Sequence, residues 1–141
     1  MFNHQGGPTR LSGRPGRTRR GGDSDFPDRL SDVWHEAIDF ADRVYDLTAS
    51  FPSTERFGLT SQMRRAAVSV SSNIAEGSGR PSGVEFMRFL GIAYGSLVET
   101  ISQSHLAARH HFLDPAGLED LRMCAEKVAR MLSGLRTSLE R

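Results

Sequence analysis

Apolar side chains recur every three or four residues through most of this chain, and this spacing restricts it to helical folds. The clearest case follows Asp114, where one face of a continuous stretch is apolar; its members are Leu118, Leu121, Ala125, Val128, Leu132, Leu135 and Leu139. Side chains at such spacings return to the same face of an α-helix. No segment shows the alternation that is typical of a strand. We therefore predict an all-α protein.

Proline, glycine and capping residues divide the chain into four predicted helices. The first is expected over residues 31–50, from a Ser31 cap to the break at Pro52. The second is expected over residues 54–76, with Thr60 as an alternative cap near its start. Gly77 is predicted to end this helix in the left-handed conformation.

The remaining boundaries carry stronger signals. Ser82 and Glu85 have the spacing of a capping box, which predicts a third helix that ends near residue 108. Asp114 followed by Pro115 is typical of a helix start, with aspartate as the cap. Four helices with short connections favour an antiparallel up-down-up-down four-helix bundle, which we place at residues 28–141.

Residues 1–27 are expected to form a disordered arm, because their arginine- and glycine-rich sequence holds almost nothing that could pack. Four of its arginines are candidate nucleic-acid contacts, namely Arg14, Arg17, Arg19 and Arg20. An inert extension explains this composition equally well. Removing the five arginines of residues 1–22 from the 18 basic residues leaves 13 against 17 acids, a balance of −4 for residues 23–141. Attraction to nucleic acid must therefore come from the arm or from a local basic patch.

The predicted third helix is apolar nearly all the way around. A helix in a four-helix bundle normally keeps one face in water, so the surplus indicates a second buried contact. Phe89, Ile92 and Tyr94 are the candidates for an interface with another copy of the chain. Scattered exposed apolar residues are the ordinary alternative.

The sequence argues against several classes of protein. The sequence contains no apolar run of the roughly 18 to 20 residues that cross a membrane, and no secretory signal. The single cysteine, Cys124, offers neither a disulfide nor metal-ligand spacing. We expect a cytoplasmic protein without cofactor or metal.

The central segment resembles a known family. The resemblance covers about residues 34–114 and is densest at Gln62-Met63-Arg64-Arg65-Ala66, at Asn73-Ile74-Ala75-Glu76-Gly77 and at Gly95-Ser96-Leu97 with Glu99. These motifs are similar to those of the bacterial four-helix-bundle proteins encoded in intervening sequences of large-subunit ribosomal RNA genes. The same family includes the accessory variability proteins of diversity-generating retroelements. The resemblance implies a homopentameric barrel and, for the retroelement members, binding of nucleic acid and of a reverse transcriptase. The resemblance to the retroelement members is to strongly basic proteins, whereas residues 23–141 of this chain are mildly acidic.

Four arginines of the predicted helices are candidate phosphate contacts: Arg64, Arg65, Arg80 and Arg88. For Arg64 and Arg65 a structural role competes with this hypothesis, in which one of them pairs with Glu99 and the other faces outward.

Other polar clusters favour structural roles. Asn73 and Glu76 are expected to bind free amides at the start of the third helix, beside the chain reversal at Gly77. Small residues at Ser69, Gly95 and Ser96 predict a close crossing of the second and third helices. No serine has a histidine and an acid at the spacing that nucleophilic catalysis needs, so we predict a protein that is not an enzyme.

The sequence thus favours a non-enzymatic homo-oligomer, with a pentamer implied by the resemblance, that binds RNA, DNA or a nucleic-acid enzyme such as a reverse transcriptase. The alternative is a structural or protein-binding oligomer without a nucleic-acid role.

Overall fold

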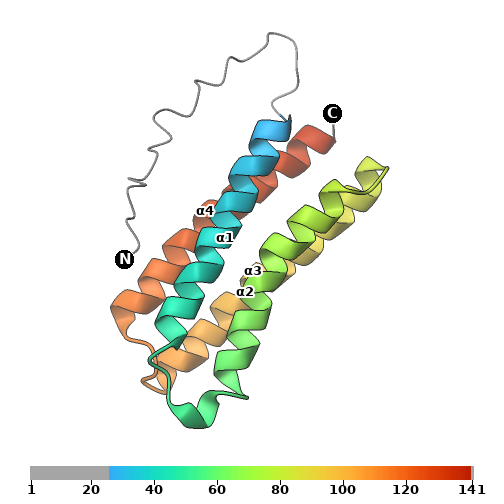
Figure 1. Cartoon of the computed structure of the whole chain (residues 1–141). Helices are drawn as coiled ribbons and strands as arrows, with labels where there is room; N and C mark the ends of the chain where they lie inside the picture. Colours follow the sequence, from blue (N-terminus) through green and yellow to red (C-terminus); the bar gives the residue numbers. More distant parts are fainter. Residues whose placement is uncertain (1–25, 141) are drawn as a thin grey trace, which may run out of the picture.

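The computed structural model of the chain describes residues 26–140, which form four α-helices and a short 3-10 turn (Figure 1). The elements are α1 (Phe26–Thr48), η1 (Ser53–Glu55), α2 (Leu59–Ser78), α3 (Gly83–Arg109) and α4 (Pro115–Leu139). The predicted arm, with the candidates Arg14, Arg17, Arg19 and Arg20, lies outside the described residues except for its last two positions, where α1 has already begun. Within residues 26–140 no helix is both long and apolar enough to cross a membrane.

The helices form the antiparallel bundle that the sequence predicts. α1 packs against α2 and α4, and α3 packs against the same two helices, so each helix occupies one corner of the bundle. Figure 1 shows that α1 begins, α4 ends and α2 turns into α3 at the same end of the molecule.

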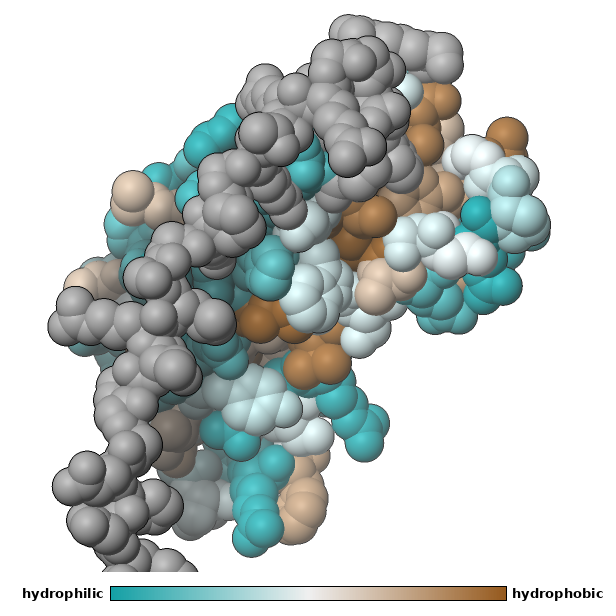
Figure 2. All heavy atoms as spheres, turned by 45° about the horizontal axis from the view of Figure 1, so that its top comes forward, coloured by the Kyte–Doolittle hydropathy of each residue, from teal (hydrophilic) through white to brown (hydrophobic). Residues whose placement is uncertain are grey.

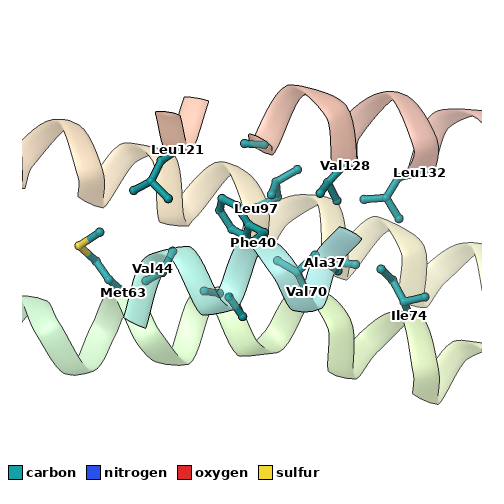
Figure 3. Packing of buried hydrophobic residues seen from close by; sticks show 14 of the residues in the cluster. Ala37, Phe40, Val44, Met63, Val70, Ile74, Leu97, Leu121, Val128 and Leu132 are labelled. Carbon is teal, nitrogen blue, oxygen red and sulfur yellow. The ribbon is translucent and has the colours of Figure 1, made fainter. Parts of the chain in front are cut away.

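The core is built from one apolar stripe of each helix. Figure 3 shows Phe40 of α1, Ile74 of α2, Leu97 of α3 and Leu132 of α4 within one continuous cluster. Phe40 and Ile74 are completely buried. Burial of these stripes, rather than helix propensity, supplies most of the stability of helices of this length.

Side-chain caps mark the starts of α3 and α4. Ser82 Oγ accepts a hydrogen bond from Glu85 N at 3.2 Å, and Asp114 Oδ1 accepts one from Gly117 N at 2.6 Å, which confirms both predicted caps. At the end of α3, His111 adopts a left-handed φ of 61°. Phe112 N then donates to Ala107 O at 2.9 Å and His111 N to Ala108 O at 3.1 Å, which is the Schellman pattern with histidine in the place of the usual glycine.

Two predicted helix starts are wrong. Ser31 lies inside α1, which begins at Phe26. Thr54 lies in η1, before α2 begins at Leu59, and the alternative cap Thr60 lies inside α2, after the cap residue Gly58. Glu55 takes over the capping of α2, because its Oε2 accepts a hydrogen bond from Leu59 N at 3.1 Å. The turn before α2 is therefore closed by a carboxylate that sequence spacing did not indicate.

The predicted role of Gly77 is also wrong. Gly77 does not end α2 but lies within it, fully enclosed, and the helix continues to Ser78. A Cβ atom at this position would lie 2.7 Å from Phe89 Cβ and 2.9 Å from Phe86 Cδ2. The glycine is needed because α3 approaches the backbone of α2 too closely for any side chain.

The predicted crossing of α2 and α3 at small residues is found for two of its three members. Ser69 Oγ and Ser96 Oγ share a hydrogen bond of 2.8 Å between these helices. Gly95 is exposed, and a Cβ atom there would meet nothing within 4 Å, so this glycine takes no part in the crossing.

Candidate functional site

An open groove of about 760 Å³ lies on the outer surface where α2 begins, between α1 and α2. Its charged lining residues are three arginines, Arg56, Arg64 and Arg65, and no aspartate or glutamate lines it. Two aromatic residues, Tyr45 and Phe57, border the same groove. Guanidinium groups beside aromatic rings match a ligand that carries both negative charge and flat apolar faces.

Arg64 is held rigidly against α1. Its Nε donates to Thr48 Oγ1 at 2.9 Å, and its Nη2 donates to the carbonyl oxygen of Tyr45 at 3.4 Å. The guanidinium carbon lies 4.5 Å from the centroid of the Tyr45 ring. Thr48 is itself buried and donates to Val44 O at 2.7 Å, so the whole contact is ordered.

The predicted ion pair with Glu99 is not formed by Arg64 or by Arg65. Glu99 Oε1 accepts a hydrogen bond from Gln103 at 3.3 Å, one turn along its own helix. Arg64 points to α1 instead, because its position on α2 faces α1 and not α3. Arg65 is exposed, and within residues 26–140 it has no hydrogen bond or ion pair, so its charge is available to a ligand.

Arg80 and Arg88 lie away from this groove. Arg80 follows the opposite end of α2, where its Nη2 is 2.9 Å from Glu76 Oε1 and its guanidinium carbon lies 4.7 Å from the centroid of the Phe89 ring. Arg88 is exposed on the first turns of α3. The four candidates therefore do not form a single surface: only Arg64 and Arg65 share the groove, and Arg56 joins them there.

Sequence analysis missed Arg56, Phe57 and Tyr45 as site residues. Arg56 and Phe57 lie in the turn before α2, which carries no helical spacing to mark them. Tyr45 fits the apolar stripe of α1, but its ring is 44% exposed beneath Arg64. The sequence feature that could have indicated this site is the adjacent pair Arg56-Phe57 before Gly58.

Asn73 and Glu76 do not bind the start of α3 as predicted. Asn73 Nδ2 donates to Ser69 O at 2.8 Å and to Ser69 Oγ at 2.9 Å, so it supports the Ser69–Ser96 contact. Glu76 pairs with Arg80. Both side chains stabilise the α2–α3 hairpin, but through α2 itself and the turn that follows.

The negative balance of the body is concentrated on α1. This helix holds six acidic residues and two arginines, whereas α2 holds two arginines and one glutamate. Ion pairs join α1 to α4: Arg43 contacts Asp120 at 2.6 Å, and Lys127 contacts Glu36 at 2.7 Å. The hydrogen bond to Glu36 raises the pKa of Lys127. The groove on α2 therefore keeps a local positive charge although residues 23–141 are acidic in sum.

The predicted interface residues of α3 lie in different surroundings. Phe89 is half-buried against Gly77 and Arg80, so its apolar surface is explained within the chain. Ile92 is 42% exposed and Tyr94 is 48% exposed. Ile92 precedes Ser96 by one turn and so flanks α2, whereas Tyr94 borders a hollow lined by α4. Two separate flanks of α3 thus carry unburied apolar surface.

The comparisons with known proteins agree with this architecture. The family model of the 23S rRNA-intervening sequence proteins matches residues 29–134. The chain belongs to this family. No curated protein is significantly similar to the chain. Among solved structures, it is similar to a protein of unknown function from the S23 ribosomal protein family of Bacteroides thetaiotaomicron, with 21% identity and a TM-score of 0.71 over 77% of this chain and 98% of that one. At this identity the likeness shows the fold.

The 23S rRNA-intervening sequence family is not a known enzyme family. The Ser69 hydroxyl binds Ser96 and Asn73, and burial raises the pKa of the Cys124 thiol, which favours the unreactive form. Across residues 26–140, no three histidine, cysteine or acidic side chains cluster in a way that could hold a metal ion.

Proposed function

We propose that this 23S rRNA-intervening sequence protein is a non-enzymatic, self-assembling helical protein that binds nucleic acid through the α2 groove. The observation that carries nucleic-acid binding is the group of three guanidiniums, from Arg56, Arg64 and Arg65, in one groove without a carboxylate. Arginine binds phosphate oxygens in a planar, bidentate way, and it dominates such surfaces. A cyclic assembly would repeat the groove around the ring and multiply a modest local charge. In the cell, an accessory role beside a reverse transcriptase would fit the same surface.

Nucleic-acid binding is tested by titrating labelled structured RNA with the full chain over a series of salt concentrations. We expect the logarithm of affinity to fall linearly with the logarithm of salt, because phosphate contacts release counterions. Replacing Arg56 and Arg65 together with alanine should lower the slope by about one for each lost contact.

Arg109 of α3 and Lys127 of α4 provide a control of equal charge, since both are exposed and line neither the groove nor the hollow beside Tyr94. Their replacement with alanine should leave the slope close to that of the wild type. If the wild type did not bind RNA at low salt, or if both double variants lowered the salt slope equally, the proposed site would be contradicted.

Self-assembly is supported by the distribution of exposed apolar side chains. Five of the nine large apolar residues that are exposed among the described residues lie on α3: Val84, Ile92, Tyr94, Val98 and Leu106. Figure 2, which turns the end of the bundle where α1 begins toward the viewer, shows apolar surface on that end as well. A hollow lined by Leu30, Trp34 and Ala75 lies there between α1 and α2. Because Ile92 and Tyr94 lie on opposite flanks, each subunit offers two different patches, as a ring of head-to-tail contacts requires.

The solution mass tests the assembly. We expect the wild type to have several times, and for a pentamer about five times, the chain mass of 15.6 kDa. The double variant Ile92→Asp/Tyr94→Asp should be monomeric, since a buried, unpaired carboxylate opposes association by several kcal/mol. Met123→Asp is the control, because Met123 is 59% exposed on α4. A wild-type protein that is monomeric at micromolar concentration would rule out the cyclic assembly.

A further inference from the structure

The side chain of Phe57 is the most exposed large apolar group of the described residues, with 89% of its surface in contact with solvent. It is not on a loose loop. Gly58 N donates to Glu55 O at 3.0 Å, Arg56 N donates to Ser53 O at 3.2 Å, and the Glu55 carboxylate holds the first turn of α2. The backbone on both sides of Phe57 is therefore fixed, and the ring is presented to solvent by an ordered turn.

The surroundings of Phe57 are cationic. The guanidinium carbon of Arg56 lies 5.4 Å from the centroid of the ring. Arg65 lines the same groove with no partner of its own in the described part of the chain. A protein partner with an apolar surface would have to bury these charges without compensation, at a considerable desolvation cost. A ligand with negative charges beside flat apolar rings satisfies both features of the groove.

We infer that Phe57 is a stacking platform for an unpaired base of single-stranded nucleic acid, an inference that rests on the proposed function and specifies its ligand. A protruding aromatic ring can stack only on a base whose face is free. In a duplex the base faces are covered by their neighbours, so a duplex could use the arginines but not the ring. Single strands supply phosphates for Arg56 and Arg65 together with a base for Phe57.

Tyr45 contributes to the groove in a different way. Its ring already has the Arg64 guanidinium 4.5 Å from its centroid, and this contact fixes the position of the cation. The groove thus has one ring that orients an arginine and one ring that is largely exposed to solvent. The exposed ring, Phe57, carries the base contact, and its removal should reduce affinity without removing charge.

The experiment compares a labelled 12-nucleotide single-stranded RNA with the corresponding duplex, using the full chain and its variants over a salt series. We expect the single strand to bind more tightly than the duplex. Phe57→Ala should weaken single-strand binding about tenfold or more, as loss of one base–aromatic stack does, while the salt slope stays unchanged. Arg65→Ala is the matched comparison, because it should lower the slope by about 0.7 for one phosphate contact on a single strand.

Two further substitutions separate stacking from simple apolar contact. Phe57→Trp should keep the affinity, and RNA should quench the added tryptophan emission relative to the wild type, which has only Trp34. Phe57→Leu should bind as weakly as Phe57→Ala. If leucine restored the affinity, the ring would not act by stacking and the inference would be overturned.

The outcomes distinguish the inference from the proposed function. If neither RNA binds at low salt, both fail. If both RNAs bind and Phe57→Ala binds as the wild type does, the nucleic-acid function stands and only the role of Phe57 is lost. If Phe57→Ala changes the solution mass and leaves the affinity for RNA intact, the Phe57 side chain contacts a second copy of the chain and the inference is wrong.

Discussion

Replacing Gly77 with alanine should destabilise the bundle, although alanine is the better helix former. In a helix interior alanine is normally favoured over glycine by about 1 kcal/mol. At Gly77 the new Cβ would lie 2.7 Å from Phe89 Cβ, an atom attached directly to the backbone of α3, which cannot rotate away. The helices would have to separate, and overpacking of this kind costs about 1–3 kcal/mol.

Gly134→Ala is the matched control, because a Cβ atom at Gly134 of α4 would meet nothing within 4 Å. It should raise the free energy of unfolding by up to about 1 kcal/mol. The gain in helix propensity is common to both positions, so the two variants should differ by the overpacking cost at Gly77, about 1–3 kcal/mol. Urea unfolding at one fixed protein concentration measures it, because stability depends on concentration in a protein that associates. Stabilisation by Gly77→Ala would show that α3 is not tightly packed there.

Replacing Phe40 with alanine should cause the largest loss of stability. The Phe40 side chain is completely buried, and Figure 3 shows it among core residues of the other helices. Removal of a buried phenylalanine ring leaves a cavity and costs about 3–5 kcal/mol. That is a large part of the 5–15 kcal/mol that stabilises an ordinary domain.

Chemical denaturation followed by circular dichroism measures the effect of Phe40→Ala. Phe57→Ala serves as the control, because it removes the same atoms from a ring that is 89% exposed, and its expected change is within about 0.5 kcal/mol. Similar losses from both substitutions would contradict the packing of the core.

The architecture was predictable from the sequence because its main signals are local. The Asp114 cap and the Ser82 cap each act within one turn, and apolar spacing defines the buried face of a helix without reference to its neighbours. The error at Gly77 has a physical reason. A glycine after an apolar stripe is typical of a helix end, and only the approach of Phe89 shows that it is a packing residue inside the helix.

The candidate site was less predictable, since it depends on which neighbour each helix face meets. The sequence predicted that Arg64 or Arg65 pairs with Glu99 of α3, and only the three-dimensional arrangement shows that Arg64 binds Thr48 of α1 instead. Arg56 and Phe57 lie in a turn, where no periodicity constrains the direction of a side chain. The sum of charges does not locate the groove either, because it does not separate α1 from α2.

The unequal charges of α1 and α2 give the bundle an electric dipole across its width. A polyanion that approaches the α1 side is repelled by the excess of carboxylates, and the resulting torque turns α2 toward it before contact. Such orientation raises the share of diffusional encounters that lead to binding, and it weakens as salt shortens the range of the field. The acidic residues of α1 would then promote association with an anionic ligand by excluding the wrong orientation, although they never touch it.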